Sequence, residues 1–195
     1  MAARIAGRGW RVAALLSLLS CQVTDGSHSA TPATYGLGTP ASASDIAALD
    51  GDVSPSGEGL PPGRGDAIAG AALYAAQCAS CHGAGGEGMT PNPALVGREP
   101  REGFPFGGDP KLVRTIGNYW PEATTLFDYI KRTMPLTAPG SLSDDEVYSL
   151  TAHLLVANEI LPAGATLDSA TLVAVRMPAR DRFVPDDRRG GRDVR

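Results

Sequence analysis

The stretch Asp66-Ala-Ile-Ala-Gly-Ala-Ala-Leu-Tyr-Ala-Ala-Gln-Cys-Ala-Ser-Cys-His82 decides the fold of this chain. Asp66 is a residue type that caps helices, and the apolar residues after it recur every three or four positions. The sequence therefore predicts a helix that runs from Asp66 to Cys78. Gly70 weakens such a helix, and a close crossing by a second helix is one reason for a glycine there.

The helix ends in Cys78-Ala-Ser-Cys81-His82, the attachment motif of a c-type haem. Three other uses of the motif fit less well. A thioredoxin-like dithiol belongs after a strand in a βαβ unit, which the sequence does not contain. A zinc site needs four ligands, and only His28 or His153 could be added, at no recognised spacing. A disulfide between Cys78 and Cys81 would close too small a loop to stabilise the fold. We therefore predict one haem, bound covalently through Cys78 and Cys81, with His82 on its iron.

Two further helices follow the motif. One is predicted from about Pro121 to Met134, where Pro135 stops it. The other begins at Ser143, with Glu146 completing a capping box, and carries apolar residues on one face. Glycine and proline dominate the segments between, and no strand is convincing. The sequence predicts an all-α domain of three or more helices over residues 66–158, flanked by extended N- and C-terminal segments.

Composition agrees with a small, loop-rich domain that folds around a cofactor. The chain has 195 residues, of which 24 are Gly and 16 are Pro, well above the usual combined share of about 12%. A helical domain of this size has too few apolar side chains for a large core, and a buried haem would supply apolar area. Residues 21–175 hold seven basic and 17 acidic side chains, so we do not expect nucleic acid as a partner.

The amino terminus predicts export. Residues 1–20 contain three arginines and then an apolar run that matches the core of a signal peptide and is too short to span a bilayer. The run ends in Leu18-Leu19-Ser20-Cys21, which resembles a bacterial lipobox. We interpret Cys21 as a lipidation site, with a simple cleavable signal peptide as the alternative. Residues 21–65 are then a tether and extended segment, of which the part from Tyr35 onward is expected to lie against the domain.

The sixth ligand of the iron separates electron transfer from ligand binding or catalysis. Candidates are Met89, Met134, Met177, His28 and His153. Met134 lies at a helix end before Pro135, about fifty residues after the motif, where the chain can present it to the far face of the ring. We therefore predict ligation by His82 and Met134. An iron with both positions filled passes single electrons and binds no substrate.

These features, in this order, resemble the class I cytochromes c over roughly residues 66–158. A narrower resemblance, to the cytochrome subunits of molybdenum-containing sulfite dehydrogenases and of sulfur dehydrogenase, is carried by the segments Tyr35-Gly-Leu-Gly-Thr-Pro40, Leu60-Pro-Pro-Gly63, Thr115-Ile-Gly-Asn-Tyr-Trp-Pro121, Ala123-Thr-Thr-Leu-Phe-Asp-Tyr-Ile130, Ser143-Asp-Asp-Glu-Val-Tyr148 and Arg176-Met-Pro178. Some sulfur-dehydrogenase cytochromes carry two haems, whereas this chain has one motif.

The resemblance implies a periplasmic subunit that accepts electrons from a molybdenum-containing dehydrogenase and passes them to a downstream cytochrome or the respiratory chain. A free-standing electron carrier and a haem enzyme or gas sensor with an open iron are the alternatives. Tyr119 and Trp120 either pack beside the haem or hydrogen-bond its propionates, and Arg132 either pairs with a propionate or faces water. Residues 159–195 form a C-terminal extension, expected to wrap the domain or meet the partner before a disordered end.

Overall fold

The computed structural model describes residues 35–184. The predictions for the signal peptide, Cys21, His28 and the end of the C-terminal extension therefore lie outside the described residues. The described residues fall into two units, residues 35–40 and residues 41–184. Within the first, the described residues Tyr35–Pro40 form no helix or strand and are exposed.

Helices dominate the described part of the second unit, as the sequence predicts. The α-helices between residues 35 and 184 are α1 (Ala43–Leu49), α2 (Ala67–Gln77), α3 (Ala79–His82), α4 (Ala123–Thr133), α5 (Asp144–Ala157) and α6 (Ser169–Val173). Two short 3-10 helices, η1 (Pro105–Gly107) and η2 (Arg180–Arg182), lie in the loops. Asp66 caps α2 by accepting hydrogen bonds from the backbone of Ile68 and Ala69. Ser143 and Glu146 form the predicted capping box of α5.

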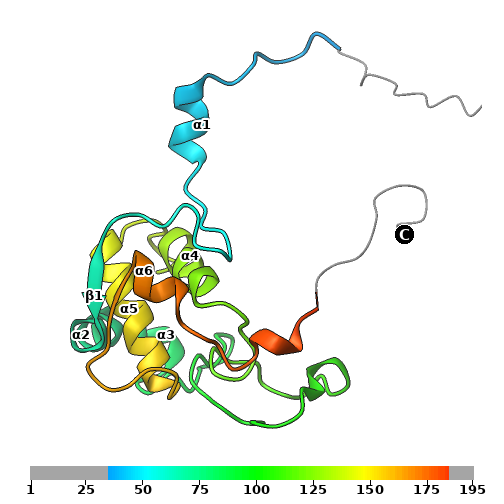
Figure 1. Cartoon of the computed structure of the whole chain (residues 1–195), viewed down its shortest axis with the longest axis vertical. Helices are drawn as coiled ribbons and strands as arrows, with labels where there is room; N and C mark the ends of the chain where they lie inside the picture. Colours follow the sequence, from blue (N-terminus) through cyan, green and yellow to red (C-terminus); the bar gives the residue numbers. More distant parts are fainter. Residues whose placement is uncertain (1–34, 185–195) are drawn as a thin grey trace, which may run out of the picture. The chain divides into compact units, whose positions relative to one another are not determined.

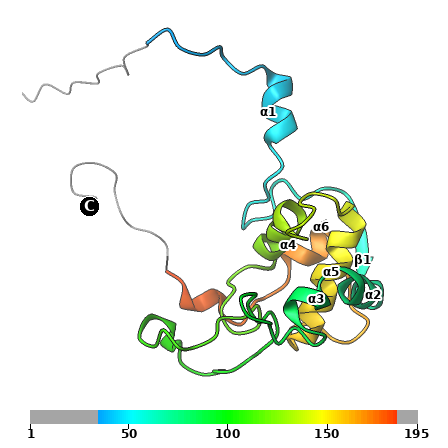
Figure 2. The same cartoon turned by 180° about the vertical axis from the view of Figure 1, so that it is seen from behind.

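Helices α2 and α5 cross in direct backbone contact, and they lie side by side in both views (Figures 1 and 2). A Cβ atom added at Gly70 would lie 1.9 Å from the carbonyl oxygen of Ser149. The predicted reason for this glycine is therefore confirmed.

The core lies between α5 and α4. Phe127 of α4 and Tyr148 of α5 are fully buried with their ring centroids 4.5 Å apart. The Tyr148 hydroxyl donates a 2.9 Å hydrogen bond to the carbonyl of Pro61, and burial raises the pKa of this phenol to about 12. The hydroxyl of Tyr148 thus fixes the chain at Pro61, shortly before α2 begins.

A small sheet departs from the prediction that the chain has no strand. Strands β1 (Arg64–Asp66) and β2 (Thr166–Asp168) pair antiparallel, with Arg64 opposite Asp168. The strands have three residues each and lie far apart in the sequence, so neither shows a period that could predict it. The pairing places the chain after α5 against the start of α2.

Residues after β2 continue across the core. Leu172 of α6 is fully buried, and Met177 is 2% exposed. Helix α6 contacts α4 (Figure 1). The apolar residues between Leu167 and Ala179 therefore cover part of the core that the three predicted helices leave open.

The segment before β1 is only partly packed. The backbone N–H of Val53, a buried residue, donates a 2.8 Å hydrogen bond to Asp128 on α4. By contrast, residues 41–46 are exposed, so within this unit contact with the core begins near Val53. Residues 35–40 belong to the other unit, and the expectation that the chain lies against the domain from Tyr35 onward stays a prediction.

No helix between residues 35 and 184 combines the length and the apolar composition needed to cross a membrane.

Candidate functional site

The two cysteines of the motif lie on one short helical segment. Cys78 ends α2 and begins α3, and its N–H donates to the carbonyl of Tyr74. Cys81 is three residues further, so both thiols leave the same side of the helix. Gly83, with a φ of 83°, ends α3. The sequence thus places two thiols and a histidine within one turn.

Both thiols are free, and their environment argues against a dithiol redox site. Burial, with a smaller contribution from Cys81, raises the pKa of the Cys78 thiol, whereas a nucleophilic cysteine needs a lowered pKa. Between residues 35 and 184, no three His, Cys, Asp or Glu side chains come together to hold a metal ion. The geometry therefore does not favour the zinc alternative.

Tyr74 fixes the end of the motif. It is buried, and its hydroxyl donates a 2.9 Å hydrogen bond to the carbonyl of Gly83. Burial, followed by the nearby Cys78 and Glu87, raises the pKa of Tyr74 to about 12, so the phenol stays protonated and remains a donor. The sequence showed Tyr74 only as an apolar position of the helix.

The ring of His82 is oriented by the loop that follows it. Its Nδ1 lies 2.9 Å from the carbonyl oxygen of Pro93. Because a carbonyl only accepts, Nδ1 carries the proton and Nε2 keeps a lone pair for a metal. The loop is held in turn by hydrogen bonds from Gly88 to the His82 carbonyl (2.7 Å) and from Leu95 to the Gly86 carbonyl (2.8 Å). Sequence analysis missed the role of Pro93, because a backbone carbonyl has no sequence pattern.

Met134 is the C-cap of α4, where its N–H donates to the carbonyl of Ile130. Its side chain is partly buried. The other candidates for the sixth ligand differ. Met177 is buried in the core, Met89 is 52% exposed, and His153 packs against the ring of Tyr74 with centroids 5.2 Å apart.

Tyr119 and Trp120 lie in different surroundings. Tyr119 packs against three phenylalanines, stacked on Phe104 with centroids 5.6 Å apart, and the guanidinium of Arg114 lies 5.0 Å from its ring centre. Trp120 is partly buried against Tyr129, with centroids 5.9 Å apart. The hydrogen bonds of residues 35–184 include none from either ring's polar atom, so a role toward a propionate stays a prediction.

Arg132 is held by its own helix. Its guanidinium forms an ion pair with Asp128 through two hydrogen bonds. Arg132 is exposed, and its two expected roles, pairing with a propionate or facing water, stay predictions.

The residues present fit a haem. Two free thiols lie on one turn, the Nε2 atom of His82 is available, and the thioether of Met134 is partly accessible. Apolar side chains around the end of α4 stay uncovered, since Tyr129 is 45% and Leu136 is 71% exposed. A flat apolar ring with one metal is the kind of group that such a donor set and such a surface would take.

Comparison with known proteins gives the same assignment. Residues 65–154 match the family described as cytochrome C oxidase, cbb3-type, subunit III. The chain is 36% identical over 90 residues to a thiosulfate dehydrogenase of Allochromatium vinosum, and the alignment covers 46% of this chain and 31% of that protein. It is 31% identical over 99 residues to a thiosulfate dehydrogenase of Stutzerimonas stutzeri, and that alignment covers 48% of this chain and 28% of the relative. The match thus spans about a third of these relatives.

One solved structure is similar over most of the chain. It is a chain of the sulfane dehydrogenase SoxCD from Paracoccus pantotrophus, with 40% identity and a TM-score of 0.68. The alignment covers 79% of this chain and 73% of that one.

Proposed function

Because this chain belongs to the cytochrome c family, whose members bind haem c covalently, we propose that it is a monohaem electron carrier ligated by His82 and Met134. Cys78 and Cys81 lie in the Cys-x-x-Cys-His region that attaches the haem. The iron of a bound haem holds or releases one electron. The observation that carries the proposal is the Nδ1 hydrogen bond of His82 to the Pro93 carbonyl, which leaves Nε2 as the ring nitrogen that can bind a metal.

The surroundings of the candidate methionines support Met134 as the sixth ligand of the iron. Met177 fills the core at 2% exposure, and using it as a ligand would require withdrawing a core side chain. Met89 follows His82 in a loop that hydrogen-bonds back to the His82 carbonyl, on the side of the ring that His82 takes. Met134, after α4, is only partly buried, so its use as a ligand withdraws no core side chain. With both positions filled, the chain excludes substrate from the iron and leaves it an outer-sphere carrier.

The donor we propose is a dehydrogenase that oxidises an inorganic sulfur compound. Its support is the likeness to a sulfane dehydrogenase and to two thiosulfate dehydrogenases, together with the sequence resemblance to sulfite dehydrogenase cytochromes. Oxidation of sulfite to sulfate takes up one water and releases two electrons and two protons. A single haem therefore accepts the two electrons in two successive steps and passes each to a downstream cytochrome or the respiratory chain.

We place the mature protein outside the cytoplasm, in the periplasm, held by lipid on Cys21. The support is the sequence of residues 1–21 alone. Mass spectrometry of the protein from its own membrane fraction would detect a lipid on Cys21, and an unmodified mature chain that begins after Cys21 would contradict the anchor.

The test of the donor uses the full-length tagged protein, isolated gently from its native host with whatever binds it. The oxidised preparation is mixed with sulfite, and in a second aliquot with thiosulfate, while the ferrous haem absorption is followed. Fast reduction by one of them, together with a co-purifying molybdenum protein, is the expected result.

Two controls make the outcome decisive. A Cys78→Ser/Cys81→Ser variant should show no haem absorption under the same conditions. The isolated cytochrome, stripped of its partner, should be reduced by dithionite and only slowly by sulfite or thiosulfate. A preparation that dithionite reduces, but that neither sulfur compound reduces and no dehydrogenase accompanies, would favour the free-standing carrier instead.

A further inference from the structure

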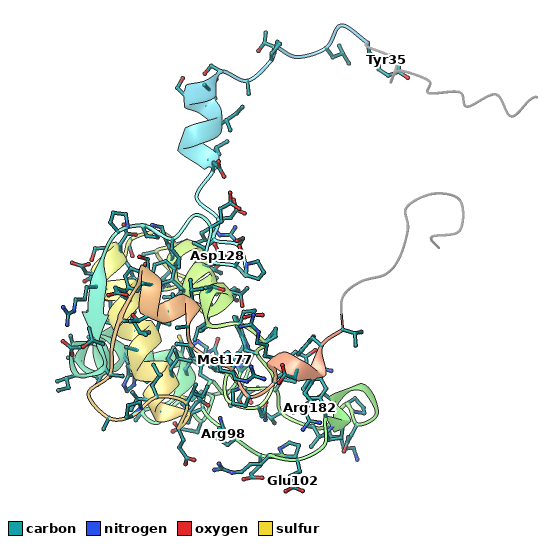
Figure 3. All side chains as sticks on the ribbon, in the orientation of Figure 1. Tyr35, Arg98, Glu102, Asp128, Met177 and Arg182 are labelled. Atoms are coloured by element: carbon teal, nitrogen blue, oxygen red, sulfur yellow. The ribbon has the colours of Figure 1, made fainter. Side chains whose placement is uncertain are left out.

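A single charged side chain interrupts the uncharged stretch around the Cys-x-x-Cys-His motif. Between residues 67 and 97, Glu87 is the only Asp, Glu, Lys or Arg, whereas 19% of the whole chain is charged. The next charged residue is Arg98, which Figure 3 labels in the loop that follows. Glu87 is therefore the charge that lies nearest to the motif along the sequence.

The fold turns Glu87 back onto the residue after His82. A Cβ atom added at Gly83 would overlap the carboxylate of Glu87, so this carboxylate lies directly beside the Cα of Gly83. The N–H of Gly85 donates a 2.8 Å hydrogen bond to its Oε2 atom. The N–H of Gly88, the next residue, donates to the His82 carbonyl. The carboxylate is thus held in place by the loop although Glu87 is exposed.

The charge of this carboxylate is not neutralised within the part of the chain that the structure describes. None of the ion pairs of residues 35–184 includes Glu87. Its charge also acts on the neighbourhood of the motif: burial is the main reason why the pKa of Tyr74 rises to about 12, and the charges of Cys78 and Glu87 add to it. A fixed negative charge therefore lies beside the residue that follows the proposed iron ligand.

We propose that Glu87 lowers the midpoint potential of the haem by stabilising the oxidised iron. Oxidation adds one positive charge at the iron, and a fixed carboxylate nearby attracts it. The charge around a redox centre is one of the properties by which a protein sets its potential. The inference rests on the proposed function, since it needs a haem whose iron is bound by His82. It deepens that function by naming a side chain that makes the haem a weaker acceptor and a stronger donor of electrons.

The test measures the midpoint potential of the purified haem protein at pH 7 and low ionic strength. It compares the wild type with Glu87→Gln and with a matched control, Glu58→Gln. The amide oxygen of glutamine can still accept from the N–H of Gly85, so Glu87→Gln removes the charge and keeps the anchor. Glu58 is exposed, lies before β1 and forms no ion pair among the described residues.

We expect Glu87→Gln to raise the potential by several times the shift that Glu58→Gln causes. Equal shifts in the two variants would overturn the proposal. Ionic strength then separates a charge effect from a structural one, because salt screens an exposed charge. The difference in potential between the wild type and Glu87→Gln should shrink as sodium chloride is raised from about 10 mM to about 1 M. A difference that stays constant over this range would also overturn the proposal.

Two further variants complete the series. Glu87→Asp keeps the charge on a shorter side chain and should have a potential close to that of the wild type. A shift as large as that of Glu87→Gln would assign the effect to the lost contact and overturn the proposal. Glu87→Ala takes the place of Glu87→Gln in both measurements if the latter does not accumulate as haem protein, and the same outcomes decide.

Carbon monoxide distinguishes a failure of this inference from a failure of the proposed function. The reduced wild type should not bind it readily, because His82 and Met134 fill both positions of the iron. Ready binding would contradict the proposed ligation whatever the potentials show. Equal potentials in the wild type and Glu87→Gln, with a haem that resists carbon monoxide, would overturn the role of Glu87 alone.

Discussion

The crossing of α2 and α5 and the surface at the end of α4 are built in opposite ways. At the crossing, Gly70 meets the backbone of Ser149 so closely that no side chain fits between them. At the end of α4, Tyr129 and Leu136 are 45% and 71% exposed, and Met134 is only partly buried. The first region is complete from protein atoms alone. The second is an apolar surface that includes Met134, the sixth ligand we propose, and a haem would complete it.

This difference predicts that substitutions at the crossing act on folding, whereas substitutions beside the haem act on the redox potential. The predictions below test that division, from the largest expected effect to the smallest.

Gly70→Ala should cause the largest loss of stability. An added Cβ would lie 1.9 Å from a carbonyl oxygen and 2.5 Å from the carbonyl carbon of Ser149, so the helices must separate. We expect the free energy of unfolding to fall by about 3 kcal/mol or more. Gly51→Ala is the matched control, since a Cβ there meets nothing within 4 Å, and should stay within about 0.5 kcal/mol. The free energy of unfolding of both variants, as haem proteins, is measured by denaturant unfolding. Equal values for Gly70→Ala and Gly51→Ala would contradict the close crossing.

Asp128→Asn should cost less, about 2 kcal/mol at pH 7. Asp128 is 8% exposed and accepts hydrogen bonds from the N–H of Val53 and the guanidinium of Arg132, each at 2.8 Å. The exposed pair Arg176–Asp181 supplies the control, because Asp181→Asn should cost less than about 1 kcal/mol. The midpoint potential should be unchanged in both variants. A large shift of potential in Asp128→Asn would mean that this side of α4 also belongs to the haem site.

The stability difference between the wild type and Asp128→Asn should depend on pH. Burial opposes the charge of Asp128, but its hydrogen bonds to Arg132 and Val53 outweigh burial and hold its pKa below the usual range. A carboxyl with a lowered folded pKa contributes its full stability above the unfolded value of about 3.9 and loses it as the pH falls through the folded value. The stability gap between the wild type and Asp128→Asn should therefore narrow below about pH 4. A gap that stays constant from pH 7 to pH 3 would contradict this.

His153→Gln should have the smallest effect, visible only as a change in the slope of stability against pH. Burial lowers the pKa of His153, so the folded state binds its proton less readily than the unfolded chain does. Stability should therefore fall as the pH drops below the unfolded value of about 6.5. Denaturant unfolding between pH 7.5 and 5 should show this fall in the wild type and a flatter profile in His153→Gln. Identical profiles would show that His153 is not desolvated at the crossing.

Sequence patterns predicted the parts of the fold and site that local chemistry decides. The Asp66 cap, the Ser143–Glu146 capping box and the close approach at Gly70 are all present. The predicted second helix begins two residues later than expected, at Ala123, and ends at Thr133.

Long-range contacts escaped prediction. The pairing of β1 with β2 joins segments too short to show a period, and the Pro93 carbonyl that orients His82 has no side-chain pattern. Asn158 is a similar case. It is fully buried, accepts from the N–H of Gly97 at 2.9 Å and donates to the carbonyl of Leu95 at 3.2 Å. Only the folded chain shows that this helix-end amide holds the loop after the motif.

The most direct test of the account is a comparison of Met134→Ala with Met177→Leu, because the account assigns one methionine to the iron and the other to the core. In each purified haem protein, the midpoint potential is measured and carbon monoxide is added to the reduced form. We predict that Met134→Ala lowers the potential and binds carbon monoxide readily, because thioether ligation raises the potential and fills the sixth position. Met177→Leu conserves volume and should match the wild type in both measurements. A wild-type response from Met134→Ala, or an open iron in Met177→Leu, would contradict the account.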